Sequence, residues 1–95
     1  MAYHRVVFRV HAIERMSSLV VSEAEVRAIL EEGDVVEVSA EPSGGLKRIY
    51  NGTIDTTPIH VVAIDLEDVQ LTVVVTVYEP TLDRWTDQFR RRRPN

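Results

Sequence analysis

Leu71-Thr72-Val73-Val74-Val75-Thr76-Val77-Tyr78 is the most apolar segment of this chain of 95 residues, and it decides the fold. Its β-branched residues favour extended backbone. Strands with this composition usually have a neighbour on each side and at least one covered face. We therefore predict a central β-strand at residues 71–78, whose alternation divides its side chains between two faces. One face carries Leu71, Val73, Val75 and Val77, and the other carries Thr72, Val74, Thr76 and Tyr78.

The segments before this strand predict two hairpins. Residues 58–66 are apolar and connect to the central strand through a turn at residues 67–69. Residues 34–40 and 47–53 flank the Pro-Ser-Gly-Gly loop at residues 42–45, which is typical of a turn between paired strands. Everything from residue 34 to residue 78 is therefore expected to be sheet.

At the N-terminus the period of the apolar residues changes from that of a strand to that of a helix. Residues 3–10 alternate and predict a strand with one mostly apolar face and one partly basic face. Residues 11–19 then place Ala12, Met16 and Leu19 on one stripe of a helix.

Two further helix starts are visible in the sequence. Ser22 and Glu25 have the spacing of a capping box, in which each side chain binds the backbone N–H of the other residue. Gly33 is expected to end this helix in a left-handed turn. After Glu79-Pro80, Thr81 is expected to begin a short terminal helix. Its apolar stripe would consist of Leu82, Trp85 and Phe89.

The predicted fold class is α+β, with the order β-α-α-β-β-β-β followed by the C-terminal helix. The two helices pack on one face of a small, mostly antiparallel sheet, because two helices cover one face only. We expect a single domain over residues 1–89 and a flexible basic tail over residues 90–95. The other face, which bears Tyr78 and threonines and takes arginines from the first strand, is expected to stay partly open. It is the first place to look for a site.

Composition and charge exclude several classes of protein. The formal net charge is −4, and it divides into −8 over residues 1–83 and +4 over residues 84–95. An acidic body does not attract phosphate backbones at long range, which disfavours a general nucleic-acid binder. The chain has no cysteine, so a disulfide framework and thiolate metal sites are absent. No apolar run approaches the roughly 18 residues of a membrane span, and we expect a cytoplasmic protein without metal or cofactor.

The candidate catalytic residues are His11, His60 and Tyr78. His11 and Arg15 are neighbours if the helix forms, and the cation would favour the neutral imidazole that a general base needs. The alternative is a solvated pair. His60 shares a strand face with aliphatic residues, and Tyr78 ends the central strand, where its phenol could act as an acid. The alternatives are a half-buried histidine at the edge of a strand and a packed tyrosine with an exposed hydroxyl.

The candidate substrate-binding residues are Arg15, Lys47 and Arg48. Lys47 and Arg48 are the only adjacent basic residues in the acidic body, and they could hold a phosphate. Alternatively, they keep an edge strand from aggregating.

Several of these residues together resemble the motifs of a bacterial family of small, uncharacterised domains. The matching segments are His11-Ala12-x-x-Arg15-Met16, Ser22-Glu23-x-Glu25-Val26, Ile59-His60-Val61-Val62 and Val75-Thr76-Val77-Tyr78-Glu79-Pro80 with Trp85. Genes of that family often lie beside a zinc-finger antitoxin of the MqsA type, and its fold is similar to the RelE, BrnT and MqsR toxins. The resemblance implies a RelE-like toxin of a toxin–antitoxin system.

Such a toxin is a metal-independent endoribonuclease that cleaves messenger RNA, often on the ribosome. In this chain, the resemblance assigns His11 or His60 as the base and Arg15 with Lys47 or Arg48 as the phosphate clamp. Tyr78 or the other histidine is then the acid. The implied partners are a cognate antitoxin and RNA or a ribosome. Ser17-Ser18 stands where family members commonly have basic residues.

The alternative function is a non-catalytic protein-interaction module, either a degenerate toxin or a homo-oligomer. The acidic body and the missing basic residues motivate it.

Overall fold

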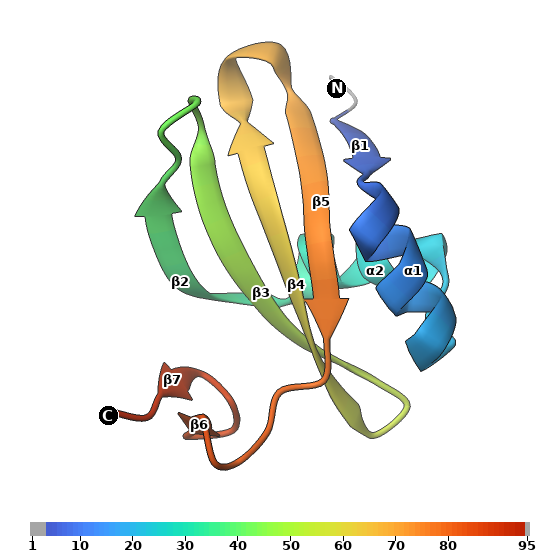
Figure 1. Cartoon of the computed structure of the whole chain (residues 1–95), viewed down its shortest axis with the longest axis vertical. Helices are drawn as coiled ribbons and strands as arrows, with labels where there is room; N and C mark the ends of the chain where they lie inside the picture. The colour runs from blue at the N-terminus through green and yellow to red at the C-terminus, as the bar shows by residue number, and fades with distance from the viewer. Residues whose placement is uncertain (1–3, 95) are drawn as a thin grey trace.

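The computed structural model describes residues 4–94, and it contains two helices beside a five-stranded sheet (Figure 1). Tyr3, predicted in the first strand, and Asn95, predicted in the basic tail, lie outside the described residues. The sheet consists of β1 (Arg5–Phe8), β2 (Asp34–Ala40), β3 (Leu46–Ile54), β4 (Thr57–Leu66) and β5 (Leu71–Tyr78). The helices are α1 (Val10–Leu19) and α2 (Glu23–Glu32), with a short 3₁₀ turn, η1 (Glu67–Val69), between β4 and β5.

The strands follow the order β1-β5-β4-β3-β2 across the sheet. β1 is parallel to β5, and the other neighbours are antiparallel, so the predicted α+β class with a mostly antiparallel sheet is confirmed. The prediction of β5 as the central strand is wrong, because β4 occupies the middle. β5 still has a neighbour on each side, which is the condition that its composition indicates.

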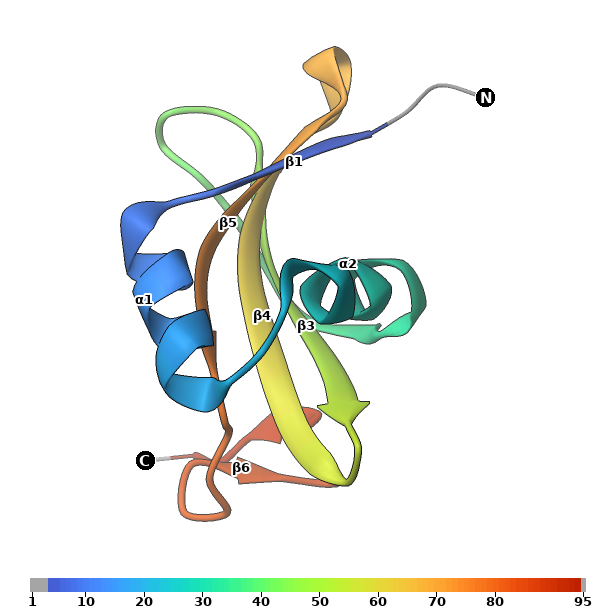
Figure 2. The same ribbon diagram turned by 90° about the vertical axis from the view of Figure 1, so that its right-hand side faces the viewer.

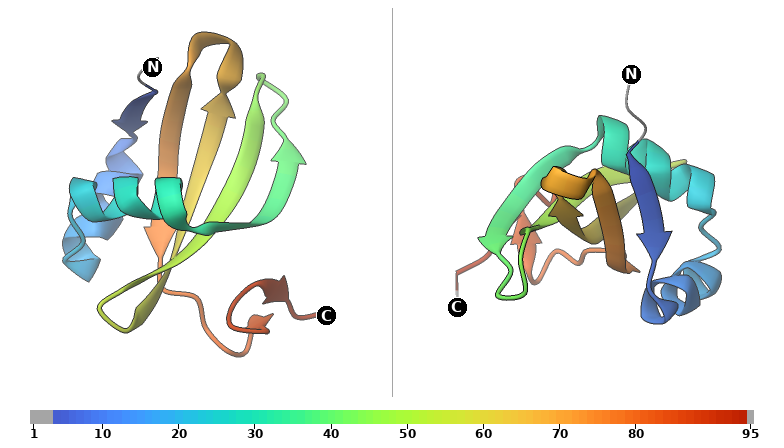
Figure 3. Two further views of the ribbon diagram at one scale, coloured as in Figure 1. Left: turned by 180° about the vertical axis from the view of Figure 1, so that it is seen from behind. Right: turned by 90° about the horizontal axis from the view of Figure 1, so that it is seen from above.

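The two helices cover one face of the sheet, as the sequence predicts. α1 lies along β5 and α2 crosses the strands nearer β3, which Figure 2 and the left view of Figure 3 show from two directions. The core between helices and sheet is formed by aliphatic side chains such as Ala12, Met16, Val26, Ile59 and Val61.

The helix ends are partly as predicted. Ser22 and Glu25 form the capping box, with Glu25 N–H donating to Ser22 Oγ at 3.1 Å and Ser22 N–H donating to Glu25 Oε1 at 2.9 Å. Gly33 is not left-handed, because its φ is −74°. A Cβ there would lie 2.6 Å from the backbone oxygen of Ile29 and 2.7 Å from that of Asn51, so close approach explains this glycine.

A bulge in β5 changes the predicted faces of that strand. Val62 pairs with Thr76 and Ala63 pairs with Val74, so Val75 is an extra residue. Val74 and Val77 therefore both pack against the helices, whereas Val75 and Tyr78 pack on the opposite side. The predicted alternation holds up to Val75 and is wrong from Thr76 onward.

The predicted C-terminal helix does not form. Thr81 accepts backbone hydrogen bonds from Arg84 and Trp85, which closes one turn, and the chain then becomes extended. β6 (Trp85–Thr86) and β7 (Arg91–Arg92) form a small antiparallel hairpin. We call residues 81–93 the strap, and Figure 1 shows β6 and β7 at the lower left, below β2, connected to the lower end of β5.

Over residues 4–94, neither helix combines the length and the apolar character that crossing a bilayer requires.

Candidate functional site

The register of the sheet arranges the face opposite the helices in rows of side chains, because paired residues point to the same side. One row consists of Tyr78, His60, Asn51 and Asp34. The next consists of Thr76, Val62, Ile49 and Glu37, and a third of Val7, Val73, Ile64 and Lys47.

The strap covers the first two rows. Trp85 is only 3% exposed and packs with Ile49 and Val62, and Phe89 lies against the same cluster. The third row is more open, since Val7 is 44% exposed. The expectation of a partly open face thus applies to the third row of side chains and not to the rows near Tyr78.

His60 lies beneath the strap and is fully buried. Its Nε2 is 2.9 Å from the backbone oxygen of Phe89, and its Nδ1 is 3.1 Å from the Tyr78 hydroxyl. A carbonyl oxygen only accepts, so Nε2 carries the proton. Nδ1 of the neutral ring then accepts a hydrogen bond from Tyr78. Trp85 packs edge-on against the imidazole with ring centroids 4.4 Å apart.

The surroundings of this pair keep His60 neutral and Tyr78 protonated. Burial lowers the pKa of His60 and Arg92 lowers it further, while the Phe89 carbonyl and Glu37 oppose these effects without outweighing them. Burial also raises the pKa of Tyr78. A neutral imidazole whose Nδ1 carries no proton is the form that can accept the proton of the Tyr78 hydroxyl.

Glu37 and Arg92 are the charged residues next to the pair. Arg92 donates two hydrogen bonds to the Glu37 carboxylate, at 2.8 and 3.1 Å, and its guanidinium lies 4.7 Å from the Trp85 ring centroid. The hydrogen bonds from Arg92 lower the pKa of Glu37. Both side chains are partly exposed, so an incoming anion could compete for the guanidinium.

Of the predicted site residues, the structure brings only His60 and Tyr78 together. His11 and Arg15 are exposed on α1, and no hydrogen bond or ion pair within residues 4–94 joins them to His60 or Tyr78. Lys47 and Arg48 point to opposite faces of β3, which is an interior strand, because adjacent residues of a strand alternate. Lys47 shares the face of His60, whereas Arg48 faces the helix side.

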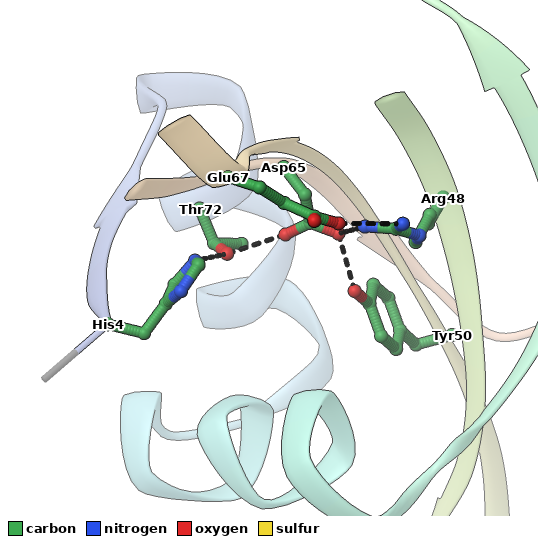
Figure 4. Close-up of polar contacts among 6 residues, drawn as sticks. All are labelled: His4, Arg48, Tyr50, Asp65, Glu67 and Thr72. Carbon is green, nitrogen blue, oxygen red and sulfur yellow. Dashed lines mark hydrogen bonds and ion pairs between the residues drawn. The ribbon is translucent and has the colours of Figure 1, made fainter. Parts of the chain in front are cut away.

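Arg48 belongs to a separate polar cluster on the helix side of the sheet (Figure 4). Asp65 lies at the centre of the cluster and is only 5% exposed. It accepts hydrogen bonds from Arg48 at 2.8 Å, Tyr50 at 2.5 Å and Thr72 at 2.5 Å. The Thr72 hydroxyl donates to Asp65, so its oxygen accepts from His4 Nε2 at 2.5 Å. The cluster borders a cavity of about 480 Å³.

This cluster keeps Asp65 ionised although it is buried. Burial raises the pKa of Asp65, but the hydrogen bonds from Thr72, Tyr50 and Arg48 outweigh burial, and the pKa is lowered overall. Burial and the bond to Asp65 raise the pKa of Tyr50 to about 12. Three donors occupy the carboxylate, so Asp65 acts as a structural anchor and Arg48 is not free to hold a phosphate.

Sequence reasoning missed Glu37, Arg92 and Asp65. Glu37 and Arg92 are 55 positions apart, and no local spacing connects them. Asp65 could have been found, because it follows the buried strand pattern of β4 on the face that Val61 and Ile59 share.

The arginines of the expected tail contact the sheet in the structure. Arg90 pairs with Asp34 at 2.8 Å, and Arg92 pairs with Glu37. Flexibility of this segment in solution stays a prediction.

The fold and the two polar clusters define a small α+β domain with a His–Tyr pair held on the sheet face away from its helices. Residues 8–79 match the family described as "Domain of unknown function (DUF4258)", and the chain belongs to this family. Comparison with curated proteins and with solved structures finds no match.

Proposed function

We propose that the chain is the toxin-like component of a toxin–antitoxin system and acts as a metal-independent endoribonuclease on messenger RNA. The hydrogen bond between the Tyr78 hydroxyl and His60 Nδ1 is the observation that carries the proposal. The motif resemblance and the arrangement of two helices on one face of the sheet support it.

The pair is suited to removing a proton from a ribose 2′-hydroxyl. The 2′-hydroxyl donates to the Tyr78 oxygen while the phenol proton moves to His60 Nδ1, so the tyrosine is neutral before and after the step. The 2′-oxygen then attacks the adjacent phosphorus, and the 5′-oxygen leaves and takes a proton from solvent. The nearby Glu37 carboxylate stabilises the imidazolium electrostatically, because its negative charge raises the pKa of His60. In this scheme His60 is the base.

Arg92 is the cation that could hold the scissile phosphate. When the phosphate displaces the Glu37 carboxylate from the Arg92 guanidinium, the guanidinium stabilises the negative charge that develops on the phosphate oxygens. Lys47 lies on the same face and is a second phosphate contact farther along the RNA. His11 and Arg15 lie on α1, which packs on the other face of the sheet, and they take no part in this scheme. The resemblance implies a clamp of Arg15 with Lys47 or Arg48, and this scheme instead proposes Arg92 with Lys47.

The partners of this function remain proposals. A cognate antitoxin, of the zinc-finger type in the resembling family, would hold the activity in check in the bacterial cytoplasm. The acidic body makes assistance by a ribosome important for RNA binding.

Induced expression in bacteria tests the function directly. The chain should arrest growth and cleave transcripts in extracts that contain ribosomes. Tyr78→Phe removes the relay and should lower the cleavage rate by about 100-fold or more. Tyr50→Phe is the matched control, because it removes a phenol oxygen on the helix side of the sheet. If folded Tyr78→Phe cleaves as fast as the parent chain, or if transcripts stay intact under strong induction, the proposal fails.

A second candidate function is a non-catalytic interaction module. The complete burial of His60, with both ring nitrogens bonded within the chain, favours it. This candidate predicts a stable oligomer or protein complex by light scattering. It also predicts that no RNA cleavage is lost when His60 is replaced.

A further inference from the structure

The strap separates the imidazole of His60 from solvent, whereas Tyr78 is half-buried. Trp85 and the Phe89 carbonyl both contact the imidazole of His60, which is 0% exposed. No RNA can reach His60 while these contacts hold. The position of the strap therefore decides whether solvent or a ligand can reach the imidazole.

The turn of the strap is strained. Asp87, Gln88 and Phe89 have φ values of 53°, 56° and 67°, so three consecutive residues that are not glycine are left-handed. Side chains at such positions crowd the following carbonyl, and single residues rather than runs normally adopt this conformation. The closed strap therefore stores conformational energy at the segment that supplies the Phe89 carbonyl.

The contacts that hold the strap against the sheet are limited. Trp85 is its one fully packed side chain, and the pairs Arg90–Asp34 and Arg92–Glu37 are partly exposed, where ion pairs contribute little. Asn51 donates to the Gln88 carbonyl at a long 3.3 Å. The Oδ1 of Asn51 is buried without a hydrogen-bond partner anywhere in the described chain. A buried acceptor without a partner costs free energy, and this cost offsets part of the contact between Asn51 and the strap.

We infer that the strap is a gate, which opens and closes over His60 and Tyr78 while the two helices and the five-stranded sheet stay folded. Opening removes the Phe89 carbonyl and Trp85 from the imidazole and frees Glu37 from Arg92. The role of the gate in controlling RNA access rests on the proposed function, but the opening itself does not.

Two reporters within the chain make the opening measurable. Trp85 is the only tryptophan, so acrylamide quenching of its fluorescence reports exposure of the strap. Diethyl pyrocarbonate modifies accessible neutral imidazoles, and mass spectrometry resolves the modification of His60 from that of exposed His11. The ratio of the two rates measures how often the gate is open.

The matched variants are Asp87→Gly and Asp87→Ala. Both remove the same exposed carboxylate, but only glycine relieves the left-handed strain. We expect the His60-to-His11 rate ratio to be about fivefold lower in Asp87→Gly than in Asp87→Ala, with Trp85 quenching lowered in parallel. Far-UV circular dichroism verifies that both variants are folded.

Two results would overturn the gate. One is an equal rate ratio in the two variants. The other is His60 modification that rises with urea only in step with the loss of circular dichroism, because the strap then opens only when the whole chain unfolds. Assaying RNA cleavage beside these measurements separates the two proposals. Local opening of the strap without RNA cleavage would support the gate and contradict the proposed ribonuclease activity. RNA cleavage without local opening would support the ribonuclease activity and contradict the gate.

Discussion

At the scale of single residues, His60 combines burial with two internal hydrogen bonds, and this combination makes stability depend on pH. Its folded-state pKa is lowered, chiefly by burial, so the unfolded chain binds the proton more readily. The stability that neutral His60 contributes is complete above the unfolded pKa of about 6.5. It is lost as the pH falls below that value toward the folded-state pKa.

We expect the free energy of unfolding to fall between pH 7.5 and pH 5.5 with a slope of up to about 1.4 kcal/mol per pH unit from this one group. His60→Gln should remove that slope, although the variant is less stable at pH 7.5. His11→Gln should keep it, because His11 is exposed on α1. Urea unfolding followed by circular dichroism at several pH values measures the slopes. An unchanged slope in His60→Gln would show that another group causes the loss.

At the scale of elements, the junction between α2 and β2 depends on Gly33. The helix ends there because the chain must pass between the backbone oxygens of Ile29 and Asn51 without a Cβ. Gly44, in the loop between β2 and β3, has the opposite constraint, with φ at +111° and open space around it.

Gly33→Ala should therefore destabilise the chain by about 1–3 kcal/mol through overpacking. It should shift the amide resonances of α2 and β3 in NMR spectra, since one of these backbones must move. Gly44→Ala should cost stability through strain alone and perturb only its own loop. If Gly33→Ala is as stable as the parent chain, the close approach described above is not present in solution.

The C-terminal segment shows how an element can be predicted wrongly from a correct local pattern. Leu82, Trp85 and Phe89 do have helical spacing, and Thr81 does begin one turn. Trp85 packs on His60 and Val62 instead of continuing the helix. Tertiary packing overrides helix propensity at that point.

At the scale of the whole molecule, the division of charge has a structural role. Residues 1–83 carry −8 and residues 84–95 carry +4, and Arg90 and Arg92 of the second group pair with Asp34 and Glu37 of the first. The charge asymmetry thus adds a small, salt-sensitive contribution to the packing of Trp85 that holds the strap against the body.

Raising sodium chloride from 0.01 M to 1 M shortens the screening length from about 30 Å to about 3 Å. We expect acrylamide quenching of Trp85 to increase by roughly twofold or less, because exposed pairs contribute little each. The circular dichroism of the sheet should not change. Quenching that is constant or falls with salt would mean that packing alone holds the strap.

The sequence by itself determined the elements whose signals are local. Alternation, apolar runs and the Pro-Ser-Gly-Gly loop predicted the five strands of the sheet. The apolar stripes predicted the two helices, and Ser22 with Glu25 predicted the cap. Each of these signals depends on residues a few positions apart. The same alternation also separates Lys47 from Arg48, although their adjacency favoured a single clamp.

Only the tertiary structure decided how the candidate site is assembled. The bulge at Val75, the strap over His60 and the pairing of Glu37 with Arg92 join segments far apart in the chain. Such contacts depend on the free energy of packing one folded segment against another, and this free energy cannot be inferred from a short stretch of sequence.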